Sequence, residues 1–182
     1  FTIHGSQPRD NAGLSTKGSD CNGIIPNSLR YLFKKIYEAN GTAISCGASY
    51  SEIYNEAIYD LLITMGNSPL RLKWAAGEGF CVPDLHIQPC NTLEDAEAVV
   101  SLGNRRRRQR AHLLNTSSSR SHTILTLYLH RSTQGPETYK SGKINFVDLA
   151  GSEKLKETCS EGLTATKETT HINKSLFLLG KV

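Results

Sequence analysis

Two short segments bring together the residue types that handle a phosphate and its metal ion. The first, residues 115–122, holds a run of hydroxyl side chains with Arg120 among them. The second, residues 148–153, begins with Asp148 directly after an apolar run and has Gly151 three positions later. Hydroxyls and carboxylates are the hard oxygen ligands that Mg²⁺ prefers. A glycine has no side chain, so its N–H can approach a terminal phosphate closely.

The order of these segments matters more than either segment alone. A Ser/Thr-rich stretch is usually a solvated turn, and an Asp followed by a Gly is common in ordinary turns. An enzyme that senses the γ-phosphate of a nucleotide, however, needs groups that bind the phosphate and its metal ion and then release them. The apolar run 144–147 places Asp148 at the C-terminal end of a strand, where open α/β sheets bind ligands. Together the two segments predict a nucleotide site.

The first half of the chain shows helix and strand signals around these segments. Pro26 is expected to open a helix that ends at about Asn40, with an apolar face at helical spacing (Leu29, Leu32, Phe33, Ile36 and Tyr37). Alternation of apolar residues predicts a strand over residues 43–54. Residues 55–62 are expected to form a short helix.

The second half supplies the elements next to the two segments. Gly and Pro interrupt residues 70–90, which predicts small antiparallel strands there. Thr92 and Asp95 form a capping box for a helix that should end near Arg107. Strands are predicted over residues 121–131 and 143–148, so the fold class is α/β, with helices on both faces of a sheet.

Composition narrows the class of protein. The length of 182 residues suits one domain, and the net charge of +4 is too mild to identify a partner. Five cysteines without a C-x-x-C pair predict reduced thiols of an intracellular protein. No apolar run reaches the roughly 20 residues that a membrane span needs, and the start lacks a signal-peptide pattern, so we expect a cytoplasmic protein without membrane insertion.

The run of four arginines at 105–108 offers a rival interpretation as a nucleic-acid-binding surface. The run falls where a helix is expected to end, where cations are favourable, and it has no interleaved aromatic residues. We therefore expect no nucleic-acid partner. If that expectation is wrong, neutralising Arg105–Arg108 should abolish binding to DNA or RNA.

The two segments resemble switch I and switch II of the kinesin motor domain. The matching patterns are Asn-x-x-Ser-Ser-Arg-Ser-His over 115–122 and Asp-Leu-Ala-Gly-Ser-Glu over 148–153. Other stretches match in the same order along the chain: residues 23–26, 49–54, 60–62, 172–176 and 179–180. The resemblance covers essentially all 182 residues. It implies a P-loop NTPase-type α/β fold with a mostly parallel or mixed central sheet.

The resemblance also implies roles for individual residues. Asn115, Ser118 and Ser119 would face the nucleotide, with Ser119 and Asp148 holding Mg²⁺ largely through water. Gly151 would sense the γ-phosphate of ATP. Arg120 and Glu153 would form an ion pair that closes the two switches, and with Ser118 they would order the attacking water.

Microtubules are the partner that the resemblance implies. Tubulin is acidic, and positive charge on the loop and helix after switch II would steer docking onto it. The residues concerned are Lys154, Lys156, Lys167 and Lys174. The location would be the cytoplasm and its microtubule cytoskeleton, and homodimerisation would depend on segments outside this chain.

No G-x-x-x-x-G-K-[ST] phosphate cradle occurs in the sequence, and kinesins place it directly before the position of Phe1. We therefore expect residues 1–182 to be the central part of a motor domain that continues at both ends. The leading hypothesis is a microtubule-stimulated ATPase motor whose isolated stretch is inactive. The alternative is a catalytically inactive, motor-derived module that binds microtubules.

Overall fold

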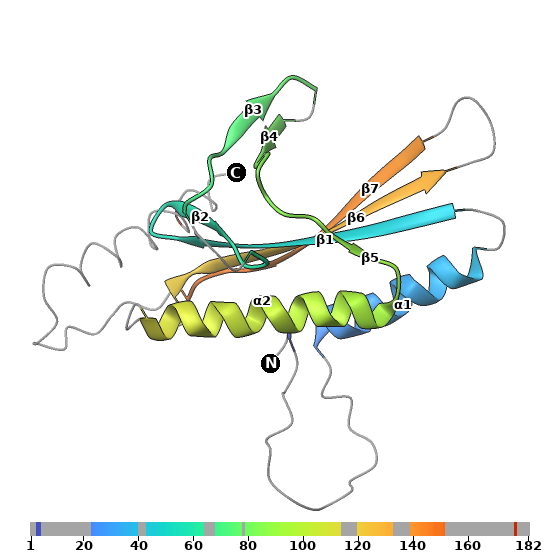
Figure 1. Ribbon diagram of the computed structural model, residues 1–182, viewed down its shortest axis with the longest axis horizontal. Coiled ribbons are helices and arrows are strands. Elements are labelled where there is room, and N and C mark those ends of the chain that lie inside the picture. The colour runs from blue at the N-terminus through green and yellow to red at the C-terminus, as the bar shows by residue number, and fades with distance from the viewer. Residues whose placement is uncertain are drawn as a thin grey trace, which may run out of the picture.

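A five-stranded sheet carries two helices on one face in the computed structural model (Figure 1). The structure describes residues 3–4, 23–39, 43–63, 68–77, 79–113, 120–132, 139–151 and 177. In this part of the chain, no helix is both long and apolar enough to cross a membrane.

The centre of the sheet is built from three long strands. They are β1 (Ala43–Tyr54), β6 (His122–Ser132) and β7 (Tyr139–Asp148), in the order β1-β6-β7. The short strands β2 (Ala57–Asp60) and β5 (Gln88–Cys90) both pair with the other edge of β1. The predicted strands are confirmed, although β7 begins four residues earlier than expected.

Every strand pairing among the described residues is antiparallel, and α1 and α2 lie on the same face of the sheet (Figure 1). The element pattern had predicted helices on both faces of the sheet, and the resemblance had implied a mostly parallel or mixed sheet; the described residues cover only part of that fold. The antiparallel pairing of β1 with β2 and of β6 with β7 follows from their connections, which are too short for a parallel crossover. The described elements therefore form an antiparallel part of an α/β fold.

The prediction of a short helix over residues 55–62 is wrong. Asn55 and Glu56 have φ values of 51° and 62°, so both occupy the left-handed region. Two such residues between paired strands make a tight hairpin turn that matches the twist of the strands. β1 consequently turns back into β2, and Tyr54 pairs with Ala57.

Helix α1 (Ile24–Glu38) confirms the predicted helix and begins two residues before Pro26. A proline fits there because the first turn of a helix has no internal partner for its N–H groups. Ile25 and Leu29 are each only 1% exposed. Tyr37, which was placed on the same apolar face, is 88% exposed, so this part of the prediction is wrong.

Helix α2 (Leu93–Leu113) starts at the predicted capping box. The backbone N–H of Asp95 donates to Thr92 Oγ1 at 3.1 Å, and the Thr92 N–H donates to Asp95 Oδ2 at 3.0 Å. The predicted end near Arg107 is wrong, because the helix runs on for another six residues. Arginine is a good helix former, and three arginines of this helix contact the sheet or the residue that follows β2 rather than mark the helix end.

A separate two-stranded hairpin lies within residues 70–90. It consists of β3 (Lys73–Ala75) and β4 (Gly79–Cys81), which confirms the small antiparallel strands expected there. The Trp74 and Phe80 rings meet edge to face with centroids 4.9 Å apart.

The core lies between the two helices and the face of β1 and β6 that they cover. Its largest fully buried side chain is Tyr50 in the middle of β1. Gly103 of α2 makes this position possible, because a Cβ there would lie 2.0 Å from Tyr50 Cδ1. The glycine therefore lets the helix backbone sit directly against the tyrosine ring.

Candidate nucleotide site

The sheet brings together the residues at which the two predicted switch segments join it. Arg120 and Ser121 come directly before β6, and Asp148 is the last residue of β7. The register pairs Thr123 with Asp148, so both segments leave the sheet at the same end. Gly151 follows three residues after Asp148.

All of the remaining predicted site residues lie outside the described part of the chain. Their roles stay predictions. They are Asn115, Ser118, Ser119, Glu153, Lys154, Lys156, Lys167 and Lys174. The Arg120–Glu153 pair is therefore also untested.

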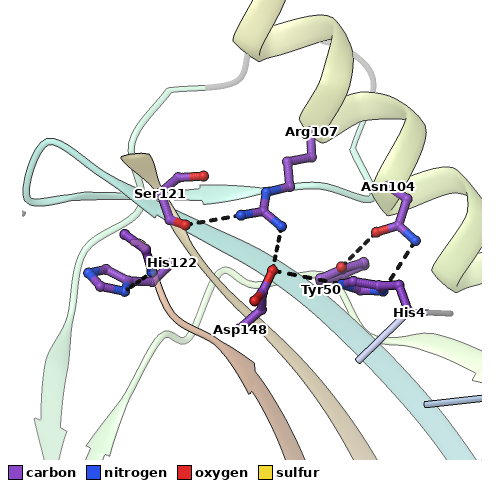
Figure 2. A network of polar contacts seen from close by, with 8 residues as sticks. His4, Tyr50, Asn104, Arg107, Ser121, His122 and Asp148 are labelled. Carbon is purple, nitrogen blue, oxygen red and sulfur yellow. Dashed lines mark hydrogen bonds and ion pairs between the residues drawn. The ribbon is translucent and has the colours of Figure 1, made fainter. Parts of the chain in front are cut away.

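An arginine that the sequence analysis had not assigned to the site connects its two halves. Arg107 Nη1 donates to Asp148 Oδ2 at 2.7 Å, and its Nη2 donates to the backbone oxygen of Ser121 at 3.0 Å (Figure 2). Its side chain is 11% exposed and that of Asp148 is 29% exposed. One guanidinium from α2 therefore holds the end of β7 and the start of β6 at once.

Such a contact is directional. The planar guanidinium presents several N–H groups in a fixed geometry, so two acceptors must sit at defined positions to be satisfied together. Charge-assisted hydrogen bonds are also roughly twice as strong as neutral ones. The Asp148 carboxylate is thus oriented by Arg107 through Oδ2, and Oδ1 takes part in neither this contact nor the one from His4 described next.

A second chain of polar groups reaches Asp148 from the core (Figure 2). The Tyr50 hydroxyl donates to Asn104 Oδ1 at 2.9 Å, and Asn104 Nδ2 lies 3.4 Å from His4 Nδ1. His4 Nε2 in turn lies 3.9 Å from Asp148 Oδ2, an electrostatic contact longer than a hydrogen bond.

The direction of this chain fixes the tautomer of His4. When Asn104 donates to Nδ1, that nitrogen is an acceptor and the ring proton sits on Nε2, facing the carboxylate. The reverse direction would point a lone pair of Nε2 at a negative charge. The Asp148 carboxylate therefore selects the arrangement in which a neutral His4 presents an N–H to it. Burial is also the main cause of the lowered pKa of His4, which keeps the ring neutral near pH 7.

His122, the last residue of the first motif, fixes the backbone after β7. The N–H of Ala150 donates to His122 Nδ1 at 2.9 Å. A protonated ring could not accept this bond, so the contact favours the neutral form. Burial lowers the pKa of His122, with the positive charge of Arg107 acting in the same direction. The segment that leads to Gly151 is thus held against the start of β6.

Other arginines of the 105–110 stretch also engage the fold. Arg106 Nη1 donates to the Leu61 backbone oxygen at 3.2 Å. Arg110 Nε donates to Glu52 Oε2 at 2.9 Å, and its guanidinium lies 3.8 Å from the centre of the Tyr59 ring. These contacts give the arginines a structural role. Arg105 and Arg108 of the run are exposed, and the absence of a nucleic-acid partner stays a prediction.

The spacing of residues along α2 is itself a signal for Arg107. Ala96 and Val99 lie on the buried face of α2, and the same spacing of three and four residues continues through Gly103 to Arg107 and Arg110. A cation on the buried stripe of a helix needs a buried partner, and the carboxylate at the end of a strand is the natural one. His4 and Asn104 had no comparable signal.

The family model for the kinesin motor domain matches residues 1–182. The chain belongs to the kinesin motor domain family. This is a family of microtubule motors that generally bind and hydrolyse nucleotide. The predicted resemblance and the kinesin-type α/β fold are confirmed.

Relatives of known name agree with this assignment. The chain is 41% identical over 163 residues to the mouse kinesin-like protein KIF9, covering 86% of this chain and 20% of that protein. It is 39% identical to mouse KIF12, over 87% of this chain and 25% of that protein. The chain thus spans about a fifth to a quarter of the length of these relatives.

Solved kinesin structures share the fold. A fast kinesin superposes with a TM-score of 0.77 at 30% identity, covering 92% of this chain and 45% of that one. A KIF14 motor, described as a dimer bound to AMP-PNP in complex with a microtubule, gives a TM-score of 0.72 at 31% identity. That match covers 90% of this kinesin chain and 48% of the other.

Proposed function

We propose that these residues form the central part of a motor domain that hydrolyses ATP with Mg²⁺ and couples hydrolysis to movement along microtubules. The observation that carries the proposal is the junction at Arg107. The Arg107 side chain donates to Asp148 at the end of β7 and to Ser121 directly before β6. Both residues belong to the two segments that match the kinesin switch motifs. A γ-phosphate sensor needs its two halves at a defined separation, and this junction would set that separation.

The described residues suit the metal that such a site requires. Asp148 is a hard oxygen donor whose Oδ2 is engaged by Arg107, and we assign Oδ1 to the hydration shell of Mg²⁺. Ser119 would be its hydroxyl partner. When bound, the metal ion would neutralise charge on the phosphates of ATP.

The remaining roles complete the proposal. Asn115 and Ser118 would face the nucleotide, and Gly151 would bring its N–H to the γ-phosphate. Arg120 and Glu153 would form the ion pair that closes the two switches and, with Ser118, orders the attacking water. Removing one partner of such a pair, when partly buried, costs about 3–5 kcal/mol, enough to set a conformational equilibrium.

Microtubule binding would draw on positive charge after switch II. The residues that we assign to it are Lys154, Lys156, Lys167 and Lys174, which complement the acidic surface of tubulin. The motor would act in the cytoplasm on the microtubule cytoskeleton, and any homodimerisation would involve segments outside residues 1–182.

The decisive test uses Glu153→Ala in the full-length protein. We expect microtubule-stimulated ATP turnover to be lost while nucleotide binding, followed with a fluorescent ATP analogue, is largely retained. Arg120→Ala should behave in the same way. Glu97→Ala is the matched control, because Glu97 is an exposed carboxylate on α2.

Two other outcomes would change the proposal. Normal turnover by Glu153→Ala would contradict the ion-pair role of Glu153. A wild-type protein that binds microtubules in a sedimentation assay but neither binds nor hydrolyses ATP would instead be a motor-derived binding module.

A further inference from the structure

Two cysteines face each other across neighbouring strands, well away from the nucleotide site. Cys46 lies in β1 and Cys90 in β5, and the register pairs them directly. Directly opposed residues point to the same face of a sheet, so both thiols lie on one side. Both are buried, with exposures of 8% and 1%.

The backbone geometry of this pair follows from its neighbours. The Leu61 N–H donates to the Tyr50 backbone oxygen at 2.8 Å, so the peptide groups of Tyr50 point to the edge of β1 opposite β6. Peptide groups alternate between the two edges of an antiparallel strand. Cys46 lies four residues before Tyr50, so its peptide groups point to the same edge, where β5 pairs.

The position of Pro89 supports this assignment independently. Pro89 is opposed to Gly47 and has no N–H to donate, so it must occupy a non-hydrogen-bonded position. Its neighbour Cys90 therefore occupies a hydrogen-bonded one. The Cα atoms of such a pair are about 5.5 Å apart, inside the range of roughly 4.4–6.8 Å that disulfides span.

A bond between these sulfurs would need a small adjustment of the strands. Directly opposed Cβ atoms are roughly 4.5–5.5 Å apart, whereas a disulfide holds them at about 3.5–4.5 Å. β5 is a three-residue strand at the edge of the sheet, so it can approach β1. The residual strain would make the bond easy to reduce, as labile disulfides are.

We propose that Cys46 and Cys90 are a modification site that closes to a reversible cross-strand disulfide by exchange with a low-molecular-weight disulfide. The Cys46 thiolate, the more exposed of the two, attacks the small disulfide and releases one small thiol. The Cys90 thiolate then attacks Cys46 Sγ and releases the second. Two protein thiols and one small disulfide thus become one protein disulfide and two small thiols.

The surroundings of the thiols determine how fast this site responds. Burial raises the pKa of the Cys46 thiol, and burial together with neighbouring Cys46 raises that of Cys90 to about 11. Few thiolates are present at pH 7, so the disulfide should form slowly, under sustained rather than brief oxidising conditions. The bond would fix β5 to β1 immediately before the Thr92 cap of α2, the helix that carries Arg107.

The test incubates the full-length protein in defined mixtures of reduced and oxidised glutathione, with low urea to speed local opening. Circular dichroism confirms that the protein stays folded. After alkylation of free thiols, mass spectrometry maps the cross-linked peptides. Trypsin alone leaves Cys81 and Cys90 together on residues 74–105, so a second cleavage before Asp84 is needed to tell them apart.

We expect a Cys46–Cys90 cross-link that disappears on return to reduced glutathione. Cys46→Ser and Cys90→Ser should each abolish it. Cys81→Ser, a partly exposed cysteine opposed to Lys73 in the β3–β4 hairpin, should leave it unchanged. Folded protein that shows only single glutathione adducts, or no reaction after equilibration, would overturn the proposal. Because no residue of the nucleotide site takes part, this result is independent of the ATPase test.

Discussion

The first half of α2 and its second half hold the same sheet by different means. The first half packs Ala96 and Val99, exposed by 1% and 4%, into the apolar core. The second half reaches the sheet through Arg106, Arg107 and Arg110, each with a specific oxygen acceptor. Gly103, against the Tyr50 ring, marks the change from one mode to the other.

This contrast separates holding a helix in place from aligning it. Apolar contact is non-directional and tolerates substitution by residues of similar volume. Guanidinium contacts fix the acceptors to within a few tenths of an ångström. The half of α2 that serves the site is therefore the half that is anchored by directional bonds, and four changes test this division.

The largest effect is expected for Arg107→Ala. Loss of the contacts to Asp148 and Ser121 leaves a partly buried carboxylate without its cation, which should lower the free energy of unfolding by about 3 kcal/mol. Urea unfolding of the full-length motor domain would measure this. Arg105→Ala, at an exposed position of the same run, should change stability by less than about 0.5 kcal/mol. Equal effects at the two positions would refute the directional role.

A somewhat smaller effect is expected for Gly103→Ala at the boundary. Alanine is the better helix former by about 1 kcal/mol, yet its Cβ would meet the Tyr50 ring at 2.0 Å. We expect a net destabilisation of about 2 kcal/mol, measured by the same unfolding experiment. A Gly103→Ala protein more stable than the wild type would show that the helix can lift away from the sheet freely.

The cap at the start of the apolar half should matter less. Thr92→Ala removes the acceptor of the Asp95 N–H and should cost about 1 kcal/mol. Thr92→Ser keeps the hydroxyl and is the matched control. ATP turnover should change little in either variant. A loss of stability as large as the one expected for Arg107→Ala would mean that the two halves are not separable.

The smallest expected effect is a pH dependence of stability that comes from two histidines near the polar contacts of Arg107. The pKa values of His4 and His122 are lowered in the folded state, mainly by burial. Below about pH 6.5 the unfolded chain takes up protons that these folded residues resist, so stability falls as the pH falls. Both rings are partly solvated, so we expect a loss of no more than about 0.5 kcal/mol between pH 7 and pH 5.5. The double variant His4→Gln/His122→Asn should show a flatter pH profile in urea titrations.

The sequence predicted the elements whose signals are local. The strand β1, the helix α1 and the Thr92–Asp95 cap were predicted from neighbouring residues alone, and the structure confirms these three elements. The turn at Asn55 and Glu56 was missed because its left-handed backbone competes with a helical interpretation of the same residues. The length of α2 was missed because an arginine run was taken for a helix end.

The candidate site, too, was predicted only where its signals are local. Asp148 was predicted from the strand before it, and the structure places it beside the start of β6. Its cation, Arg107, is one of four consecutive arginines, and the helical spacing that marks it was missed because the run was interpreted as the end of the helix. The chain from Tyr50 through Asn104 to His4 joins residues up to 100 positions apart, so no local pattern reveals it.

The ladder between β6 and β7 has a mechanical consequence. Ten consecutive residue pairs, from Thr123–Asp148 to Ser132–Tyr139, join the two strands without a break. Such a ribbon resists shear along its length, because a shift of one residue would turn every side chain to the opposite face. The residues at which the two predicted switch segments join the sheet, next to β6 and β7, are therefore held in a fixed register. If the chain acts as the proposed motor, relative movement of the two predicted switch segments would therefore arise outside this ladder.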